Sequence, residues 1–486
     1  MMMEARLRQI ATPGTYTGQE ANRLIQSLYA VAESELTQVL LKVASRGFFE
    51  FLVFMHREWG RLVTKMQKGE LDAHDANLCQ AEAALERRTL RYLLEKSVQL
   101  APLEQPAAAR DTILSYTDRA YLAARHLVEL SDHSNQLYYL YPDEAEVIIL
   151  PPYQQRYFEF QLQSAAATRY LHYRNIEQEY FRFNGKNQDD VTQLTQLIKE
   201  NLNTPFAQEL GLTFSQTMTC CDQLQHFVRA AKNSFGVFFV LEQALYEAIE
   251  KRCSYPKDAV QCVMAGLILT KESLDREKRA AFNTKQHFQA RYRPFARLPH
   301  PIGLHLTWDT GTLLWVLTNE VIHNISFGKL PDEWKRGKIT AAVNDIQQEL
   351  SRRFVYEVKD QFAACGWKCV VEVKQLRDAH NTRHIIENSP GEIDVLAVSP
   401  DGQTIAQVEC KRVSPSNDTR TYHDDLSDFY GSGKFVEKAK RKHAWLMENH
   451  AVVVHHLKCS TGIEVSDNAK IHPLFLPIRH RKIPKA

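Results

Sequence analysis

The spacing of apolar residues changes near residue 338, and this change constrains the fold more than any other feature of the chain. Before it, apolar side chains recur every three to four residues, which is typical of amphipathic helices. After it, alternating and β-branched runs indicate strands. The sequence therefore predicts a multi-domain protein, with a mostly α-helical N-terminal two-thirds followed by an α/β domain.

At 486 residues, the chain is longer than one hydrophobic core usually supports, so several domains are expected. The polar stretch Asn184–Asp190 combines turn-forming residues with a helix N-cap signal, and it gives the first boundary. We predict a helical domain at 1–183, a mostly helical domain at 184–337 and the α/β domain at 338–486.

Helical spacing is clear in six segments of the first two domains. The segments are Gln19–Phe54, Leu85–Leu100, Thr112–Leu130, Val191–Leu202, Phe235–Lys251 and Asp258–Thr270. A Pro-rich stretch, Arg293–Pro301, follows them. The patterns in these two domains predict helices but no particular activity.

The last domain begins with a long amphipathic helix that Gly366 is expected to end. Several shorter elements should follow it, in the order α-β-β-β-α-β. They are strands at Lys368–Val373, Ile393–Val398 and Thr404–Val413, a turn at Ser399–Gly402, a helix near Gly433–Glu448, a β-branched run at Ala451–Val454 and a strand near His472–Leu476.

Composition is that of an ordinary globular protein, with 44% hydrophobic and 24% charged residues. The N-terminus has no pattern of a secretion signal, and no apolar run is long enough for a membrane helix. Nine scattered cysteines fit reduced thiols, so a cytoplasmic location without disulfides is expected. The net charge is only +2, but Lys and Arg outnumber Asp and Glu by 11 to 4 from Phe429 onward. This basic end is compatible with a polyanionic partner.

Three charged residues of the α/β domain form a set with chemical meaning. Asp394 stands in one apolar strand, and Glu409 and Lys411 stand two positions apart in the next. Side chains alternate along a strand, so Glu409 and Lys411 share a face, and the turn between the strands brings Asp394 beside them. A magnesium enzyme that hydrolyses phosphodiesters needs carboxylates for the ion and a group that positions water.

Asp394, followed fifteen positions later by Glu409-Cys410-Lys411 within an α-β-β-β-α-β order, resembles the PD-(D/E)xK (restriction-endonuclease-like) nuclease superfamily. The resemblance covers the C-terminal domain only. It implies that Asp394, Glu409 and the backbone carbonyl of Cys410 bind Mg²⁺, for which Mn²⁺ substitutes. It also implies that Lys411 orients the water and stabilises negative charge. Ile393 departs from the pattern, because some members have proline there.

The resemblance also assigns roles to two helices. Many members place a glutamate on the first helix, and Glu357 is the candidate here, in competition with Glu349. In relatives, the helix after the motif flanks the scissile phosphate, so Lys434, Lys438 and Lys442 are candidates for binding the nucleic-acid backbone. For each of these residues, a solvated helix face is the alternative.

The leading hypothesis is a Mg²⁺-dependent endonuclease that acts on DNA rather than RNA, with a role by analogy in restriction or anti-phage defence. The helical region would then oligomerise or recruit a protein partner. The alternative is a catalytically inactive nuclease fold that binds nucleic acid or acts as a scaffold. A rival metal pattern, at close to zinc-finger spacing, consists of Cys365, Cys369, His380 and His384.

Overall fold

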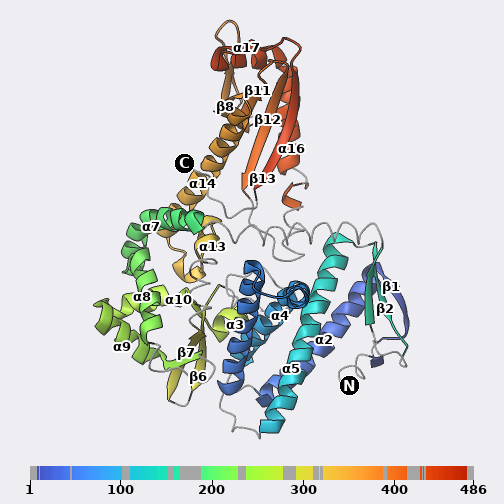
Figure 1. Cartoon of the computed structure of the whole chain (residues 1–486), viewed down its shortest axis with the longest axis vertical. Coiled ribbons are helices and arrows are strands. Elements are labelled where there is room, and N and C mark those ends of the chain that lie inside the picture. Colours follow the sequence, from blue (N-terminus) through green and yellow to red (C-terminus); the bar gives the residue numbers. More distant parts are fainter. Residues whose placement is uncertain are drawn as a thin grey trace. The chain divides into compact units, whose positions relative to one another are not determined.

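The structure is a computed structural model of the chain, and it forms two compact units, one mainly up to Val343 and one mainly from Asn344 (Figure 1). None of the described helices is long and apolar enough to cross a membrane. The residues that the structure describes are 8–9, 11–43, 46–100, 110–141, 143–151, 158–163, 188–227, 237–276, 292–300, 302–309, 313, 317, 321–386, 391–412, 427–429, 431 and 434–478.

Long helices dominate the first part of the N-terminal unit. They are α2 (Gly18–Val43), α3 (Arg46–Lys68), α4 (Ala73–Leu100) and α5 (Arg110–Asn135), which runs into the π-helical turn η1 (Gln136–Leu140). Helix α2 buries Leu24, Leu28 and Leu36 at helical spacing, as the sequence predicts. Leu269 and Leu298 join the same hydrophobic core. The predicted domain boundary at 183/184 lies outside the described residues.

The same unit contains two small sheets. The first is antiparallel, in the order β1 (Gly14–Thr17), β2 (Ala145–Ile149), β3 (Phe158–Leu162). The second has the order β4 (Val237–Leu241), β7 (Gly303–Asp309), β6 (Phe295–His300), β5 (Ile268–Leu269). The remaining elements are α7 (Gln188–Leu210), α8 (Phe214–Phe227), α9 (Glu242–Cys253), α10 (Lys257–Ala265), α11 (Lys271–Arg276), α13 (Ile322–Ser326) and the 3-10 helix η3 (Asp332–Trp334).

Two predicted helices of this unit were wrong in part. Phe235–Lys251 was predicted as one helix, but its first half contains β4, which pairs with β7, and α9 begins only at Glu242. The run Val-Phe-Phe-Val-Leu is β-branched and aromatic, and such residues fit a half-buried sheet. Asp258–Thr270 similarly divides into α10 and β5, because Ile268 and Leu269 pair with β6.

The C-terminal unit has helices on both faces of one four-stranded sheet (Figure 1). The strand order is β13 (Lys470–Ile478), β12 (Thr404–Arg412), β11 (Ile393–Val398), β8 (Lys368–Val373). In this sheet as described, β12 and β13 pair in parallel, and the other neighbouring strands pair antiparallel. A separate hairpin joins β9 (Gln375–Arg377) to β10 (Arg383–Ile385). The helices are α14 (Gly337–Ala364), α16 (Phe435–Glu448) and α17 (His450–Thr461).

Each face of this sheet has its own apolar core. On one face, Phe354 and Val358 of α14 pack with Val395 and Val408. On the other face, Leu446 of α16 and residues of α17 pack with the opposite side chains of the strands. Burial on both faces explains why the strands are nearly continuous apolar runs.

The predicted strands at Lys368–Val373 and Ile393–Val398 are confirmed as β8 and β11. The β-branched run Ala451–Val454 is not extended, because it lies in α17. Val453 and Val454 of that run, with Leu457 one turn later, are buried against the sheet. Tertiary packing thus overrides the strand preference of valine.

Gly366 ends α14 as predicted. Its φ of 84° lies in the left-handed region, where glycine is favoured. The N–H of Trp367 donates to the carbonyl of Phe362 at 3.0 Å, and the N–H of Gly366 donates to the carbonyl of Ala363 at 2.9 Å. The rings of Phe362 and Trp367 lie 5.4 Å apart. This is a Schellman motif with its apolar contact.

The β11–β12 turn gives a test of the fold. Gly402 has a φ of 69°, and a Cβ there would overlap the carbonyl oxygen of Glu464. We expect Gly402→Ala to lower the melting temperature more than Gly462→Ala. Gly462 has a similar φ of 72°, and an added Cβ there has no atom of the described residues within 4 Å. The control should lose only the conformational term, roughly 1 kcal/mol. Thermal denaturation followed by circular dichroism measures both, and equal losses would contradict the expected overlap.

Candidate active site

Asp394, Glu409 and Lys411 lie on neighbouring antiparallel strands. The ladder between β11 and β12 pairs Val395 with Val408. Continuing this register by one residue places Asp394 opposite Glu409. Lys411 follows Glu409 by two positions, so both side chains leave the same face of the sheet. The structure therefore brings the three predicted residues together.

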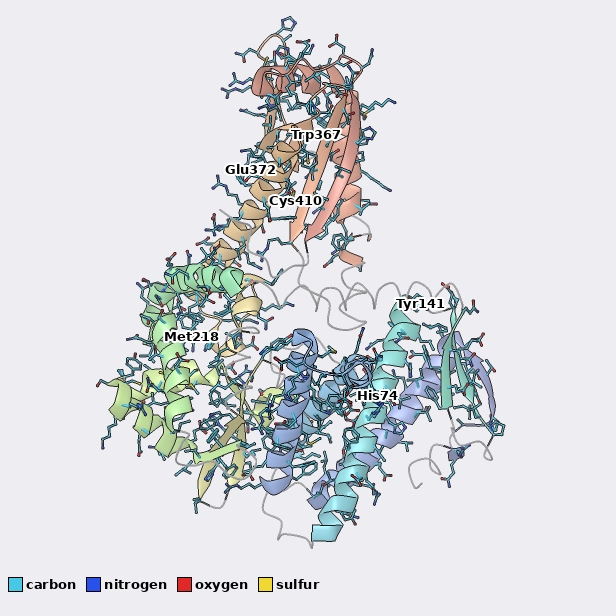
Figure 2. The ribbon with its side chains drawn as sticks, viewed as in Figure 1. His74, Tyr141, Met218, Trp367, Glu372 and Cys410 are labelled. Atoms are coloured by element: carbon cyan, nitrogen blue, oxygen red, sulfur yellow. The ribbon has the colours of Figure 1, made fainter. Side chains whose placement is uncertain are left out.

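A backbone hydrogen bond positions the carboxylate of Asp394. The N–H of Cys410 donates to its Oδ2 at 2.6 Å, and Figure 2 labels Cys410 in the C-terminal unit. Burial raises the pKa of Asp394, while the Cys410 N–H and the ammonium groups of Lys442 and Lys411 oppose this shift. The carboxylate thus reaches from β11 to β12.

Glu409 forms a buried ion pair with Lys442 of α16. Lys442 Nζ lies 2.5 Å from Glu409 Oε2, and only 11% of the lysine side chain and 12% of the glutamate side chain are exposed. The same ammonium donates to the backbone carbonyl of Glu392. Glu409 Oε1 is buried and has no hydrogen-bond partner among the described residues. One carboxylate oxygen is therefore fixed, and the other is left to bind something else.

The electrostatic environment makes Glu409 an unusual glutamate. Burial raises its pKa to about 7; Lys442 and the neighbouring Gln407 side chain oppose the shift, while the carboxylate of Asp394 adds to it. Two buried carboxylates that repel each other carry a free-energy cost in the folded state. Such arrangements concentrate at functional sites, where a cation or a proton relieves the repulsion.

Lys411 is held near an aromatic ring. Its Nζ lies 4.1 Å from the centroid of the Phe435 ring, a cation–π contact. Burial lowers the pKa of Lys411, Asp394 opposes this shift, and the ammonium groups of Lys438 and Lys442 add to it. Positive charge from two elements therefore gathers beside the two carboxylates.

Glu372 was not predicted to lie near the site, and it forms an ion pair with Arg352 of α14 at 3.1 Å. It has a φ of 51°, and its neighbours Val371 and Val373 pair with Val395 and Ile393, so Glu372 lies where β8 passes Asp394 (Figure 2). Its charge contributes to the raised pKa of Asp394. The available signal was an acidic residue within an apolar strand, but the left-handed backbone is not visible in the sequence.

Glu357 lies on α14, between the core residues Phe354 and Val358, and its Oε2 is buried. Helix α14 covers the face of the sheet opposite to the one covered by α16. The assignment of Glu357 to the site stays a prediction.

The three lysines predicted to contact phosphate lie in different environments. Lys438 is exposed, and Lys434, also exposed, pairs with Asp428 at 2.9 Å. Lys442 is buried in the ion pair with Glu409, which differs from the expected solvent-facing position. The further basic residues Arg479, Arg481 and Lys482 lie outside the described residues.

The rival zinc pattern does not gather in space. Cys369 Sγ contacts the carbonyl of Lys359 at 3.9 Å, whereas His384 Nε2 pairs with Asp378 at 3.0 Å. Within the described part of the chain, no group of three or more His, Cys, Asp or Glu side chains is arranged to hold a metal ion. These four residues therefore do not form a zinc-finger-like centre. A cation bound by Asp394 and Glu409 would need further ligands from the backbone, water or substrate.

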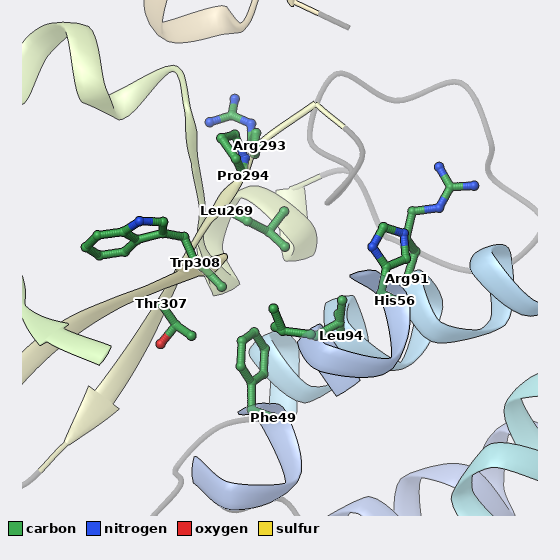
Figure 3. Close-up of a pocket in the computed structure, with 11 residues that line it drawn as sticks. Phe49, His56, Arg91, Leu94, Leu269, Arg293, Pro294, Thr307 and Trp308 are labelled. Carbon is green, nitrogen blue, oxygen red and sulfur yellow. The ribbon is translucent and has the colours of Figure 1, made fainter. Parts of the chain in front are cut away.

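A cavity of about 40 Å³ lies in the N-terminal unit (Figure 3). Phe49, Leu94 and Leu269 supply much of its apolar lining, and His56 stands at one side beside Arg91. Burial lowers the pKa of His56 well below its usual range, and nearby arginines add to this shift. The volume is enough for only a few water molecules. It is too small for a typical ligand site.

The chain matches no protein-family model, no curated protein and no solved structure. The class of site therefore has to be inferred from its own residues, which are two apposed carboxylates, a lysine two positions from one of them and a buried ion pair.

The raised pKa values of Asp394 and Glu409 predict that the stability of the folded protein depends on pH in an unusual way. The pKa of Glu409 lies above the value of about 4.5 of an exposed glutamate, so its favourable contribution is complete below about pH 4.5 and is lost as pH rises through about 7. Asp394 shifts in the same direction. We expect Asp394→Asn to raise the melting temperature relative to wild type, and to do so more at pH 8 than at pH 5.

Asp401→Asn is the matched control. Hydrogen bonds from Ser399 and Gln403 lower the pKa of Asp401, so its contribution is complete above about pH 4 and is lost only in stronger acid. The difference between this variant and wild type should be the same at pH 5 and pH 8. If Asp394→Asn also shows no change between these pH values, the proposed repulsion is absent.

Proposed function

We propose that the C-terminal unit is a metal-dependent phosphodiesterase of the PD-(D/E)xK type, which cleaves nucleic acid and most readily DNA. The observation that carries this proposal is the apposition of two buried carboxylates with raised pKa values, Asp394 and Glu409, beside Lys411. The order of the unit supports it, since the four-stranded sheet follows the expected α-β-β-β-α-β plan once the β9–β10 hairpin between β8 and β11 is set aside and α16 and α17 together are taken as the helical crossover before β13.

The donor set fits Mg²⁺. This ion prefers hard oxygen ligands, and it usually takes one or two carboxylates and completes its shell with water and substrate phosphate. Asp394 and Oε1 of Glu409, which has no hydrogen-bond partner among the described residues, supply two such oxygens, with the Cys410 carbonyl as the proposed third. A bound Mg²⁺ would offset the carboxylate repulsion, polarise the phosphate and lower the pKa of a bound water.

Lysine side chains of the unit would orient the attacking water, stabilise charge and bind the nucleic-acid backbone. Lys411 is placed to orient the attacking water and to stabilise the charge that develops on the phosphate. Its ammonium lies over the ring of Phe435, and the charge of Asp394 raises its pKa. Exposed Lys438 and Lys434 extend the positive charge along α16, where a nucleic-acid backbone would bind.

The first test removes the chemical groups. Lys411→Ala and Asp394→Ala should each lower the rate of metal-dependent DNA cleavage about 100-fold or more, because each removes a side chain that acts in the transition state. Cleavage by the wild type should require Mg²⁺ or Mn²⁺, stop with EDTA and need no zinc. Lys440→Ala, which removes an exposed lysine of α16, is the matched control and should cut normally.

Cleavage by purified Lys411→Ala at the wild-type rate would refute the assignment. Metal-independent nucleic-acid binding without cleavage by the wild type would favour the alternative, an inactive nuclease fold that acts as a scaffold.

The second test concerns substrate binding by α16. If Lys434 and Lys438 contact phosphates, replacing both with Ala should weaken binding of two unrelated duplexes equally. The slope of log affinity against log salt concentration should become shallower by up to about one unit per lost contact. Dissociation constants at several salt concentrations measure this. An unchanged slope would indicate a solvated face and exclude this helix as the backbone-binding element.

A further inference from the structure

The buried ammonium of Lys442 connects two segments that carry the proposed ligands. It donates to Oε2 of Glu409 on β12 and to the backbone carbonyl of Glu392, two residues before Asp394. The regular ladder between these strands is in place at Val395 and Val408, just short of the carboxylates. Lys442 therefore bridges the strands at the end where Asp394 and Glu409 lie.

The lysine stem is built into its position. A Cβ at Gly391 would lie 3.4 Å from Lys442 Cε, so the stem packs directly beside the backbone that leads into β11. Only 11% of the Lys442 side chain is exposed, although Lys438, one turn earlier on α16, is exposed. An ammonium held in this way has little freedom to swing out into solvent.

The two oxygens of Glu409 are therefore not equivalent. Lys442 holds Oε2, whereas Oε1 is buried without a hydrogen-bond partner among the described residues. Groups that hydrogen-bond to a metal ligand fix its orientation, and removing them commonly weakens metal binding about 10–100-fold.

We infer that Lys442 is a positioning residue, which fixes Glu409 and the start of β11 so that Glu409 Oε1 and Asp394 face a divalent cation. The inference rests on the proposed function. It assigns Lys442 to the metal site rather than to phosphate binding, and it differs from a second possibility, in which the ammonium competes with the cation for Glu409.

Binding of Mn²⁺ to the full-length protein, without nucleic acid, tests the inference. Free Mn²⁺ is measured by electron paramagnetic resonance for wild type and for Lys442→Met, which keeps most of the stem and removes the ammonium. We expect a dissociation constant about 10–100-fold higher in the variant. Lys440→Met makes the same charge change at an exposed position of α16 that has no assigned role, and its dissociation constant should stay within about twofold, because exposed charges are screened.

Lys442→Arg keeps a cation with several donors, so it should recover a large part of the affinity that Lys442→Met loses. A stem that acted only in packing would give no such recovery. Circular dichroism confirms the fold of each variant, and if Lys442→Met does not fold, Lys442→Gln takes its place with the same expected direction.

The outcomes separate the two proposals. Mn²⁺ binding by Lys442→Met that is as tight as in wild type, or tighter, would overturn the positioning role, and tighter binding would establish competition. Equal losses of Mn²⁺ affinity in Lys442→Met and Lys440→Met would show that the effect comes from net charge alone, and would also overturn the positioning role. A wild-type protein that binds no Mn²⁺ and cleaves no DNA would instead refute the proposed function, and this inference with it.

Discussion

The antiparallel pairing of β11 with β12 is the constraint on which the candidate site depends. Asp394 and Glu409 are fifteen residues apart in the sequence, and the Ser399–Gly402 turn and the Val395–Val408 register bring them face to face. Because side chains alternate along a strand, a slip of one residue would move one carboxylate to the α14 side of the sheet. The apolar cores on both faces prevent such a slip, so packing and chemistry share one register.

Burial also gives the site its electrostatic character. Helices cover both faces of the sheet, so Asp394 and Glu409 lose much of their contact with water, and burial is the largest cause of both pKa shifts. Lys442 offsets part of this cost from α16. Replacing buried charges with apolar residues of similar size is often neutral or stabilising, so stability alone does not account for these charges among apolar strands.

The sequence predicts local features of this unit well, because alternation, turn residues and a helix-ending Gly366 depend on neighbours in the chain. It predicts less where distant contacts decide. Val453 and its neighbours are β-branched but pack as a helix, and Lys442 looks like any lysine of a basic helix until α16 is placed on the sheet. Glu372 was not predicted to lie near the site, because the left-handed backbone at this position of β8 cannot be read from the sequence. The sequence therefore predicts the strand residues of the candidate site, whereas the role of Lys442 on α16 becomes visible only in the tertiary structure.

The parallel pairing of β13 with β12 has a consequence for folding. Strands β8, β11 and β12 can assemble from nearby segments, but β13 joins only after the crossover through α16 and α17, so its contacts have a long sequence separation. Until then, β12 is an open edge strand, and its unpaired backbone groups could pair with another chain. The strand that carries Glu409 and Lys411 therefore stays open to pairing with another chain until the last strand docks against it.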